Sequence, residues 1–233
     1  MSKPKHYQDP SYAGFVERYS TDIVAFAEEV LALEVSPVMA DIMRTYSKPG
    51  ARVTISSDLN RQDRWNCSPL APLALWRLFF ARSAPDQVST TLVGCPLSKL
   101  RSGNDYRRLA LRAVERQPWL QPYMHVTGEQ IYLDDRWAWN GSHIRFMAVR
   151  AAAPANIAGF ALNQPHAAWL MEDAHVIASI CYRAAGEQLN EPSASMVLSA
   201  LKGRTPARDV VGASWVDYEF AGAAMPQSTP KRQ

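Results

Sequence analysis

The sequence has little of what secreted, membrane and metal-binding proteins need. Its three cysteines, Cys67, Cys95 and Cys181, are widely spaced and odd in number, which argues against a disulfide framework and fits reduced, buried thiols. No apolar run approaches the ~20 residues of a membrane helix, and the polar N-terminus lacks the apolar core of a signal peptide. We therefore expect no membrane contact and a cytoplasmic location.

The motifs of several enzyme classes are also missing. There is no nucleophile elbow, Ser/His/Asp pattern, zinc motif or glycine-rich dinucleotide fingerprint, and the five histidines lack metal-ligand spacing. The net charge of +3 permits a nucleic-acid partner without requiring one. Composition thus leaves an ordinary globular protein whose function must be sought in local patterns.

Apolar periodicity predicts alternating helices and buried strands. Helical spacing runs between Phe15 and Tyr46, with an N-cap at Thr21-Asp22 and a second helix start at Pro37. Helices are further predicted at 70–80, 105–116 and 176–189, and strands at 52–56, 88–93, 167–171, 196–201 and 215–220. The dipeptide Asn140-Gly141 predicts a hairpin between strands at 137–139 and 143–146.

This alternation predicts an α/β fold with a mostly parallel central sheet and helices on both faces. We expect one domain over residues 15–220, a flexible segment at 1–14 and a disordered tail at 221–233. In such sheets ligands bind beyond the carboxyl ends of the strands. The informative residues should therefore follow Ser56, Val93, Met171 and Leu201.

Several short segments, taken in order, resemble the ATPase domain of phage terminase large subunits, the motors that package DNA. The segments are YSTDIVAFAEEVLALE at 19–34, PVM at 37–39, RVTISS at 52–57, ALW at 74–76, TLVGCP at 91–96, IAGFA at 157–161 and WLMEDA at 169–174. The resemblance spans about residues 15–206 and has no counterpart of the family's nuclease domain. It implies a P-loop NTPase-like fold and the cytoplasm of a bacterial host.

The segment that resembles the phosphate-binding loop lacks the residues that such a loop needs. A P-loop wraps the phosphates with glycine amides, meets them with a lysine and holds Mg²⁺ with a hydroxyl. Here no glycine occurs between Gly50 and Gly94, and no lysine between Lys48 and Lys99. Met39 also stands where the family has an adenine-contacting glutamine. The residues left at the matching place are Ser57, Asn60, Arg61, Arg64 and Ser68, where Arg61 or Arg64 could replace the lysine and Ser68 supply the hydroxyl.

The segment that resembles the Walker B strand keeps two carboxylates in inverted order. The family places an aspartate for Mg²⁺ before a glutamate that activates water, whereas here Glu172 precedes Asp173. Glu172 could hold a metal weakly and Asp173 could act as a base. Alternatively, the pair forms a solvated rim, with Asp173 capping a following helix. The turn Lys202-Gly203-Arg204-Thr205-Pro206 stands at the family's coupling motif, as a phosphate sensor or a plain turn.

The predicted helix at 105–116 carries a run of arginines. Arg107, Arg108, Arg112 and Arg116 could contact DNA phosphates or an acidic partner. The other interpretation is a solvated helix face.

These features favour a catalytically inactive packaging protein, a pseudo-ATPase without nuclease activity. The implied partners are a terminase large or small subunit, other packaging proteins and double-stranded DNA, with self-association also open. On this hypothesis no cofactor is bound. One alternative is a divergent but active ATPase using ATP and Mg²⁺, and another is a mimic of the motor domain that inhibits it.

Overall fold

The computed structural model describes residues 4–57, 68–80, 89–96, 103–134, 142–149, 168–172, 174, 177, 194–201 and 216–220. The helical elements, in chain order, are η1 (His6–Gln8), α1 (Pro10–Tyr19), α2 (Ile23–Ala25), the π-helix η2 (Phe26–Val30), α3 (Pro37–Tyr46), α4 (Ala71–Phe80), α5 (Gly103–Arg116) and η4 (Pro118–Leu120). The strands are β1 (Arg52–Ser57), β2 (Thr90–Pro96), β3 (Met124–Val126), β4 (Gln130–Leu133), β5 (His143–Val149), β6 (Ala168–Met171), β7 (Ser195–Leu201) and β8 (Val216–Phe220).

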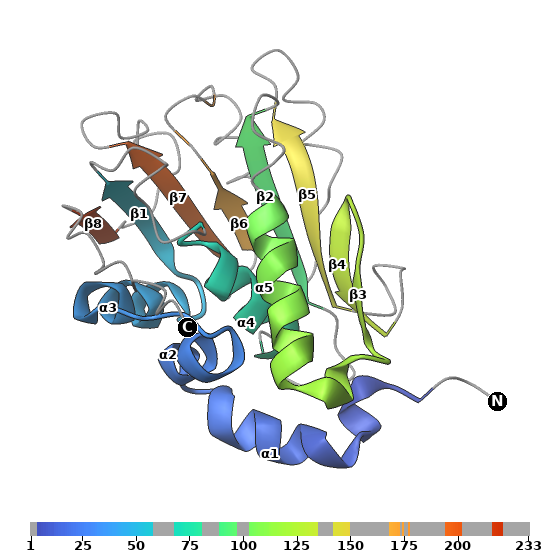
Figure 1. Cartoon of the computed structure of the whole chain (residues 1–233). Coiled ribbons are helices and arrows are strands. Elements are labelled where there is room, and N and C mark those ends of the chain that lie inside the picture. The colour runs from blue at the N-terminus through green and yellow to red at the C-terminus, as the bar shows by residue number, and fades with distance from the viewer. Residues whose placement is uncertain are drawn as a thin grey trace, which may run out of the picture.

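The described strands form one eight-stranded sheet in the order β3-β4-β5-β2-β6-β7-β1-β8 (Figure 1). The strands from β5 to β8 in this order all pair in parallel, whereas β3 and β4 pair antiparallel at one edge. The mostly parallel sheet expected from the sequence is therefore confirmed. All parallel strands point the same way, so their carboxyl ends share one edge of the sheet.

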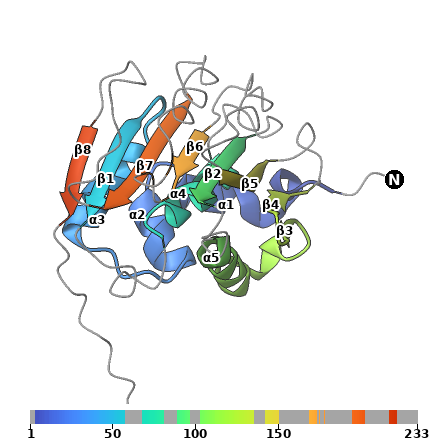
Figure 2. The same ribbon diagram turned by 90° about the horizontal axis from the view of Figure 1, so that it is seen from above.

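The described helices cover one face of this sheet. Figures 1 and 2 show α1 to α5 on the same side, with α5 lying along the strands at the outside of the helical layer. Local capping explains where the N-terminal helices start: Asp9, Asp22 and Ser36 each accept a hydrogen bond from a backbone amide in the first turn that follows. Pro37 stands at the first position of α3, where its missing amide costs nothing. Helices expected on the other face would fall outside the described residues.

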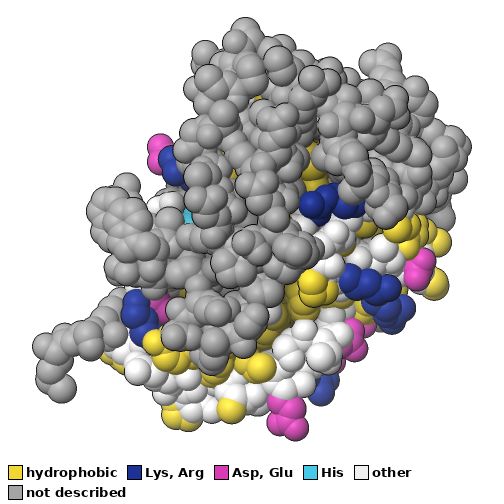
Figure 3. All heavy atoms as spheres, turned by 180° about the vertical axis from the view of Figure 1, so that it is seen from behind, with side chains coloured by type: hydrophobic (Ala, Val, Ile, Leu, Met, Phe, Trp, Pro, Cys, Tyr) yellow, Lys and Arg dark blue, Asp and Glu magenta, His cyan; other side chains and the backbone are white. Residues whose placement is uncertain are grey.

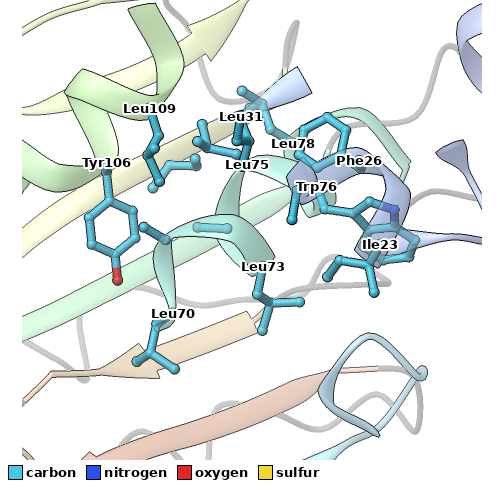
Figure 4. Close-up of a cluster of buried hydrophobic side chains, with 14 of the residues drawn as sticks. Ile23, Phe26, Leu31, Leu70, Leu73, Leu75, Trp76, Leu78, Tyr106 and Leu109 are labelled. Atoms are coloured by element: carbon cyan, nitrogen blue, oxygen red, sulfur yellow. The ribbon is translucent and has the colours of Figure 1, made fainter. Parts of the chain in front are cut away.

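The part of the core that the N-terminal helices pack against is rich in aromatic side chains. Phe26 is fully buried, and its ring lies 5.9–6.3 Å from those of Phe15, Tyr19, Phe79 and Phe80. Figure 4 shows Phe26 and Leu31 facing the side chains of α4, with Tyr106 and Leu109 of α5 closing the other end of the cluster. This shared core fixes α4 and α5 against each other, which matters for the site below.

Residues 4–14, where we expected a flexible segment, make specific contacts with the rest of the chain. His6 is 1% exposed, its amide donates to Asp134 Oδ1 over 2.7 Å, and its Nδ1 lies 2.5 Å from Asp134 Oδ2. Tyr123 also donates to Asp9. Sequence periodicity missed this because the segment is held by polar and aromatic contacts, including His6 against Tyr12, rather than by an apolar stripe.

Other expectations concern residues that the structure does not describe. The hairpin at Asn140-Gly141 with its strand at 137–139, most of the helix at 176–189 and the tail at 221–233 lie outside the described residues. The described antiparallel partner of β5 is β4, which lies earlier in the chain than the strand predicted at 137–139.

Replacing His6 by alanine should lower the free energy of unfolding by about 1–3 kcal/mol, because the buried Asp134 carboxylate loses its side-chain partner. Urea unfolding of the two proteins measures the difference. Glu17→Ala on the exposed side of α1 is the control and should change stability by less than about 0.5 kcal/mol. Equal stability of the His6→Ala variant and the parent would show that the N-terminal contact contributes nothing.

Candidate functional site

Several hydrogen-bonded polar side chains gather where the parallel strands end. Glu172 directly follows β6, and Ser68 lies in the connection between β1 and α4, three residues before the helix. The amide of Glu172 donates to the carbonyl of Gly94 in β2 over 2.8 Å, which holds the end of β6 against its neighbour. The edge predicted from the strand pattern is thus where these side chains meet.

Ser68 has its amide and its hydroxyl engaged by two different carboxylates. Its backbone N–H donates to Asp105 Oδ2 over 2.9 Å, and its hydroxyl donates to Glu172 Oε1. The same hydroxyl oxygen accepts from the amide of Leu70 over 3.1 Å, at the entrance to α4. With 8% of its surface exposed, Ser68 is closed in by this set of contacts.

Glu172 is buried and receives a second hydroxyl from α5. It is 3% exposed, and the hydroxyl of Tyr106 donates to its Oε1 over 2.6 Å. Tyr106 is itself fully buried, with its ring 5.4 Å from that of Phe146. Burial raises the pKa of Tyr106 well above its ordinary value, and the negative charge of Glu172 raises it further. The tyrosine therefore stays protonated and acts as a donor to the carboxylate.

Two carboxylates contact Ser68, in the segment that resembles the end of a phosphate-binding loop. In a P-loop the amides at the start of the following helix face the phosphates. Here the carboxylate of Asp105 accepts from the Ser68 amide at that place, and Glu172 accepts from its hydroxyl. A phosphate brought within ~4 Å of either carboxylate would meet a repulsion of about 1–4 kcal/mol, depending on solvation. The sequence between Ser57 and Ser68 has no glycine or lysine, and its cations are Arg61 and Arg64.

The structure brings together only some of the residues predicted for the site. Ser68 and Glu172 are in contact, and Ser57 is the last residue of β1. Asn60, Arg61, Arg64 and Asp173, together with the turn at 202–206, lie outside the described residues. Whether an arginine replaces the lysine therefore stays a prediction.

The arginines of α5 do not form one free basic face. Arg107 donates to the carbonyls of Thr127 and Gly128 and lies over the ring of Phe146, 5.0 Å from its centroid. Arg112 donates to the carbonyls of Leu31 and Ala32, just beyond η2. The side chains of Arg108 and Arg116 are exposed. Figure 3 shows the face of the molecule opposite α5, where described basic side chains lie close to acidic ones.

Sequence reasoning missed Asp105 and Tyr106 as residues of the site. Both were seen as the start of an amphipathic helix, because periodicity reports a helix face and not what its first turn contacts. Their position was a usable signal, since the helix follows β2, whose carboxyl end is part of the same edge. An aspartate and a tyrosine at such a helix start can reach the neighbouring strand ends.

The described residues contain no group of three or more His, Cys, Asp or Glu side chains placed to hold a metal ion. None of the helices in the described part of the chain has the length and apolar character needed to cross a bilayer.

Replacing Tyr106 by phenylalanine should flatten the loss of stability at alkaline pH. The raised pKa means that the unfolded chain releases this proton first, near pH ~10, so folding stability falls as the pH rises above that value. The difference in slope between parent and variant should approach ~1.4 kcal/mol per pH unit. Urea unfolding at pH values of about 8 to 11 measures it. Tyr19 and Tyr123 remain in both proteins, so their titration contributes equally to both curves of stability against pH. Parallel curves would therefore contradict the buried role of Tyr106.

Comparison with known proteins gives a match in structure but none in sequence. No family model matches the chain, and no curated protein matches its sequence. The large terminase of a thermophilic bacteriophage, in complex with ADP, has a TM-score of 0.53 and 8% identity, over 79% of this chain and 45% of that one. Another structure of the same terminase has a TM-score of 0.48 and 9% identity, over 80% and 45% of the two chains. The chain thus spans less than half the length of these terminases, and its fold is similar to that of a bacteriophage large terminase.

Proposed function

We propose that this chain is a DNA-packaging protein that uses a terminase-like α/β domain for binding and does not hydrolyse ATP. One observation carries the proposal: Ser68 gives its amide to Asp105 and its hydroxyl to Glu172, at the place where a phosphate and its metal would have to be. Function must be argued from the site and not from the fold. The described part of this site is filled by the protein's own acidic side chains.

The lost phosphate chemistry leaves protein binding as the role that best fits the retained fold. The exposed arginines of α5, Arg108 and Arg116, are available for an acidic surface or for DNA. The proposed partners are a terminase large subunit, its small subunit, another packaging protein or double-stranded DNA. The proposed location is the cytoplasm of the bacterial host.

Immobilised protein, incubated with purified terminase subunits and with duplex DNA, tests the binding role. We expect retention of at least one packaging protein or of DNA at about 0.15 M salt. A control in which Arg44, exposed on α3, is changed to glutamate reports nonspecific charge effects. Failure to retain any of these molecules would count against a role in packaging.

A divergent but active ATPase is the second candidate, because Ser68 and Glu172 lie close enough together to serve one Mg²⁺ if their mutual hydrogen bond opens. A hydroxyl from the phosphate loop and a carboxylate from the Walker B strand converge on Mg²⁺ in active enzymes of this type. Release of inorganic phosphate from ATP by the purified protein, abolished by Ser68→Ala, would favour this candidate over the first.

A further inference from the structure

The outer face of α5 carries a row of side chains that the fold leaves uncovered. Arg108, Leu111 and Glu115 follow one another at spacings of three and four residues, so they lie on one stripe of the helix. Leu111 is 54% exposed, and Arg108 and Glu115 are exposed beside it. Figure 2 shows α5 at the outer edge of the helical layer, where another molecule can reach this stripe.

The charged ends of this stripe are weakly used within the chain. Arg108 forms an ion pair of 3.6 Å with Asp105, in which the two side chains are 46% and 36% exposed. Glu115 makes no ion pair or side-chain hydrogen bond within the described part of the chain. Arg112, in contrast, is turned back onto the carbonyls of Leu31 and Ala32. The stripe therefore presents an arginine, a leucine and a glutamate in a line.

This line is complementary to itself. If a second α5 lies antiparallel across a twofold axis at the level of Leu111 and Arg112, residue 108 of each helix faces residue 115 of the other. Each Arg108 then meets a Glu115, and the two Leu111 side chains meet at the axis. Because Arg112 is bound to its own chain, it leaves the axis to the leucines. An isologous interface requires this kind of self-complementarity, and here it follows from the order of the residues.

We propose that the exposed stripe of α5 is a homodimer interface in which two copies pair antiparallel. The stripe fits a second copy of the chain better than DNA, because Glu115 would repel phosphates and the exposed Leu111 would find no apolar surface on the DNA backbone. The interface rests on a single helix pair, so the dimer is a weak one. Its specificity lies in the two symmetric Arg108–Glu115 pairs.

Sedimentation equilibrium of the full chain at concentrations from about 5 to about 500 µM tests the proposal. The parent should pass from monomer to dimer over this range. Arg108→Glu and Glu115→Arg should each weaken dimerisation at least about tenfold, since each substitution places like charges together twice. The double variant Arg108→Glu/Glu115→Arg restores the pairs and should return to within about threefold of the parent.

Two controls separate a specific interface from a general effect. Arg44→Glu makes the same change of charge at an exposed residue of α3 and should leave dimerisation unchanged. Leu111→Ser should weaken it without changing the circular dichroism spectrum. A parent that stays monomeric at ~500 µM would overturn the proposal, and so would a dimer that is indifferent to Arg108→Glu or a double variant that is not rescued. Binding of duplex DNA by a monomer, lost in Arg108→Glu, would instead assign the stripe to DNA.

Discussion

Replacing Glu172 by alanine should lower the free energy of unfolding by about 2–4 kcal/mol. The substitution leaves the hydroxyls of Ser68 and Tyr106, both buried, without the carboxylate to which they donate, and a buried polar group that loses its partner costs ~1–3 kcal/mol. Urea unfolding near pH 7 measures the change. A carboxylate kept for catalysis behaves in the opposite way, because its removal commonly leaves stability unchanged or raises it.

A double-mutant cycle tests whether the loss of stability in Glu172→Ala comes from its contact with Tyr106. Tyr106→Phe and Glu172→Ala should show a coupling energy of ~0.5–3 kcal/mol, because the two side chains share one hydrogen bond. Glu172→Gln keeps an acceptor of similar shape and should cost less than the alanine variant. A Glu172→Ala protein as stable as its parent would contradict a structural role for this carboxylate.

Replacing Phe26 by alanine should have the largest effect on stability, about 3–5 kcal/mol. Phe26 is fully buried at the centre of the aromatic cluster, so its removal opens a cavity between the π-helix and α4. Thermal and urea unfolding measure the loss. Phe26→Leu refills part of the volume and should recover at least half of it.

Val38→Ala is the matched control for this prediction, because Val38 is 50% exposed on α3. We expect it to change stability by less than about 0.5 kcal/mol. A loss below ~1 kcal/mol in Phe26→Ala would mean that the aromatic cluster is not the centre of the core.

The parts of the fold predicted from the sequence are those set by apolar patterns. Buried strands such as Val53 to Ile55 and Leu170 to Met171 are visible as short apolar runs, and Ser36-Pro37 marks a helix start by its capping chemistry. The sequence did not predict the contacts of residues 4–14, because His6 is held by the remote Asp134, a contact that no local pattern encodes. The π-helix from Phe26 was not foreseen either, since its apolar spacing resembles that of an α-helix.

Only part of the candidate site could be predicted from the sequence. Ser68 and Glu172 were predicted from segments that resemble the phosphate-binding loop and the Walker B strand, and both come after parallel strands whose carboxyl ends share one edge of the sheet. Asp105 and Tyr106 reach the same point from a helix, and only the packing of α5 against α4 brings them there. The carboxylate that accepts from the Ser68 amide thus comes from outside the segment that resembles a phosphate-binding loop.

Isothermal titration with a non-hydrolysable ATP analogue and Mg²⁺ tests the central claim most directly. With Asp105 and Glu172 engaged at Ser68, we expect no binding heat at ~100 µM protein. Micromolar binding that is lost in Ser68→Ala would contradict the account, because the site would then hold the very anion that its carboxylates are proposed to exclude.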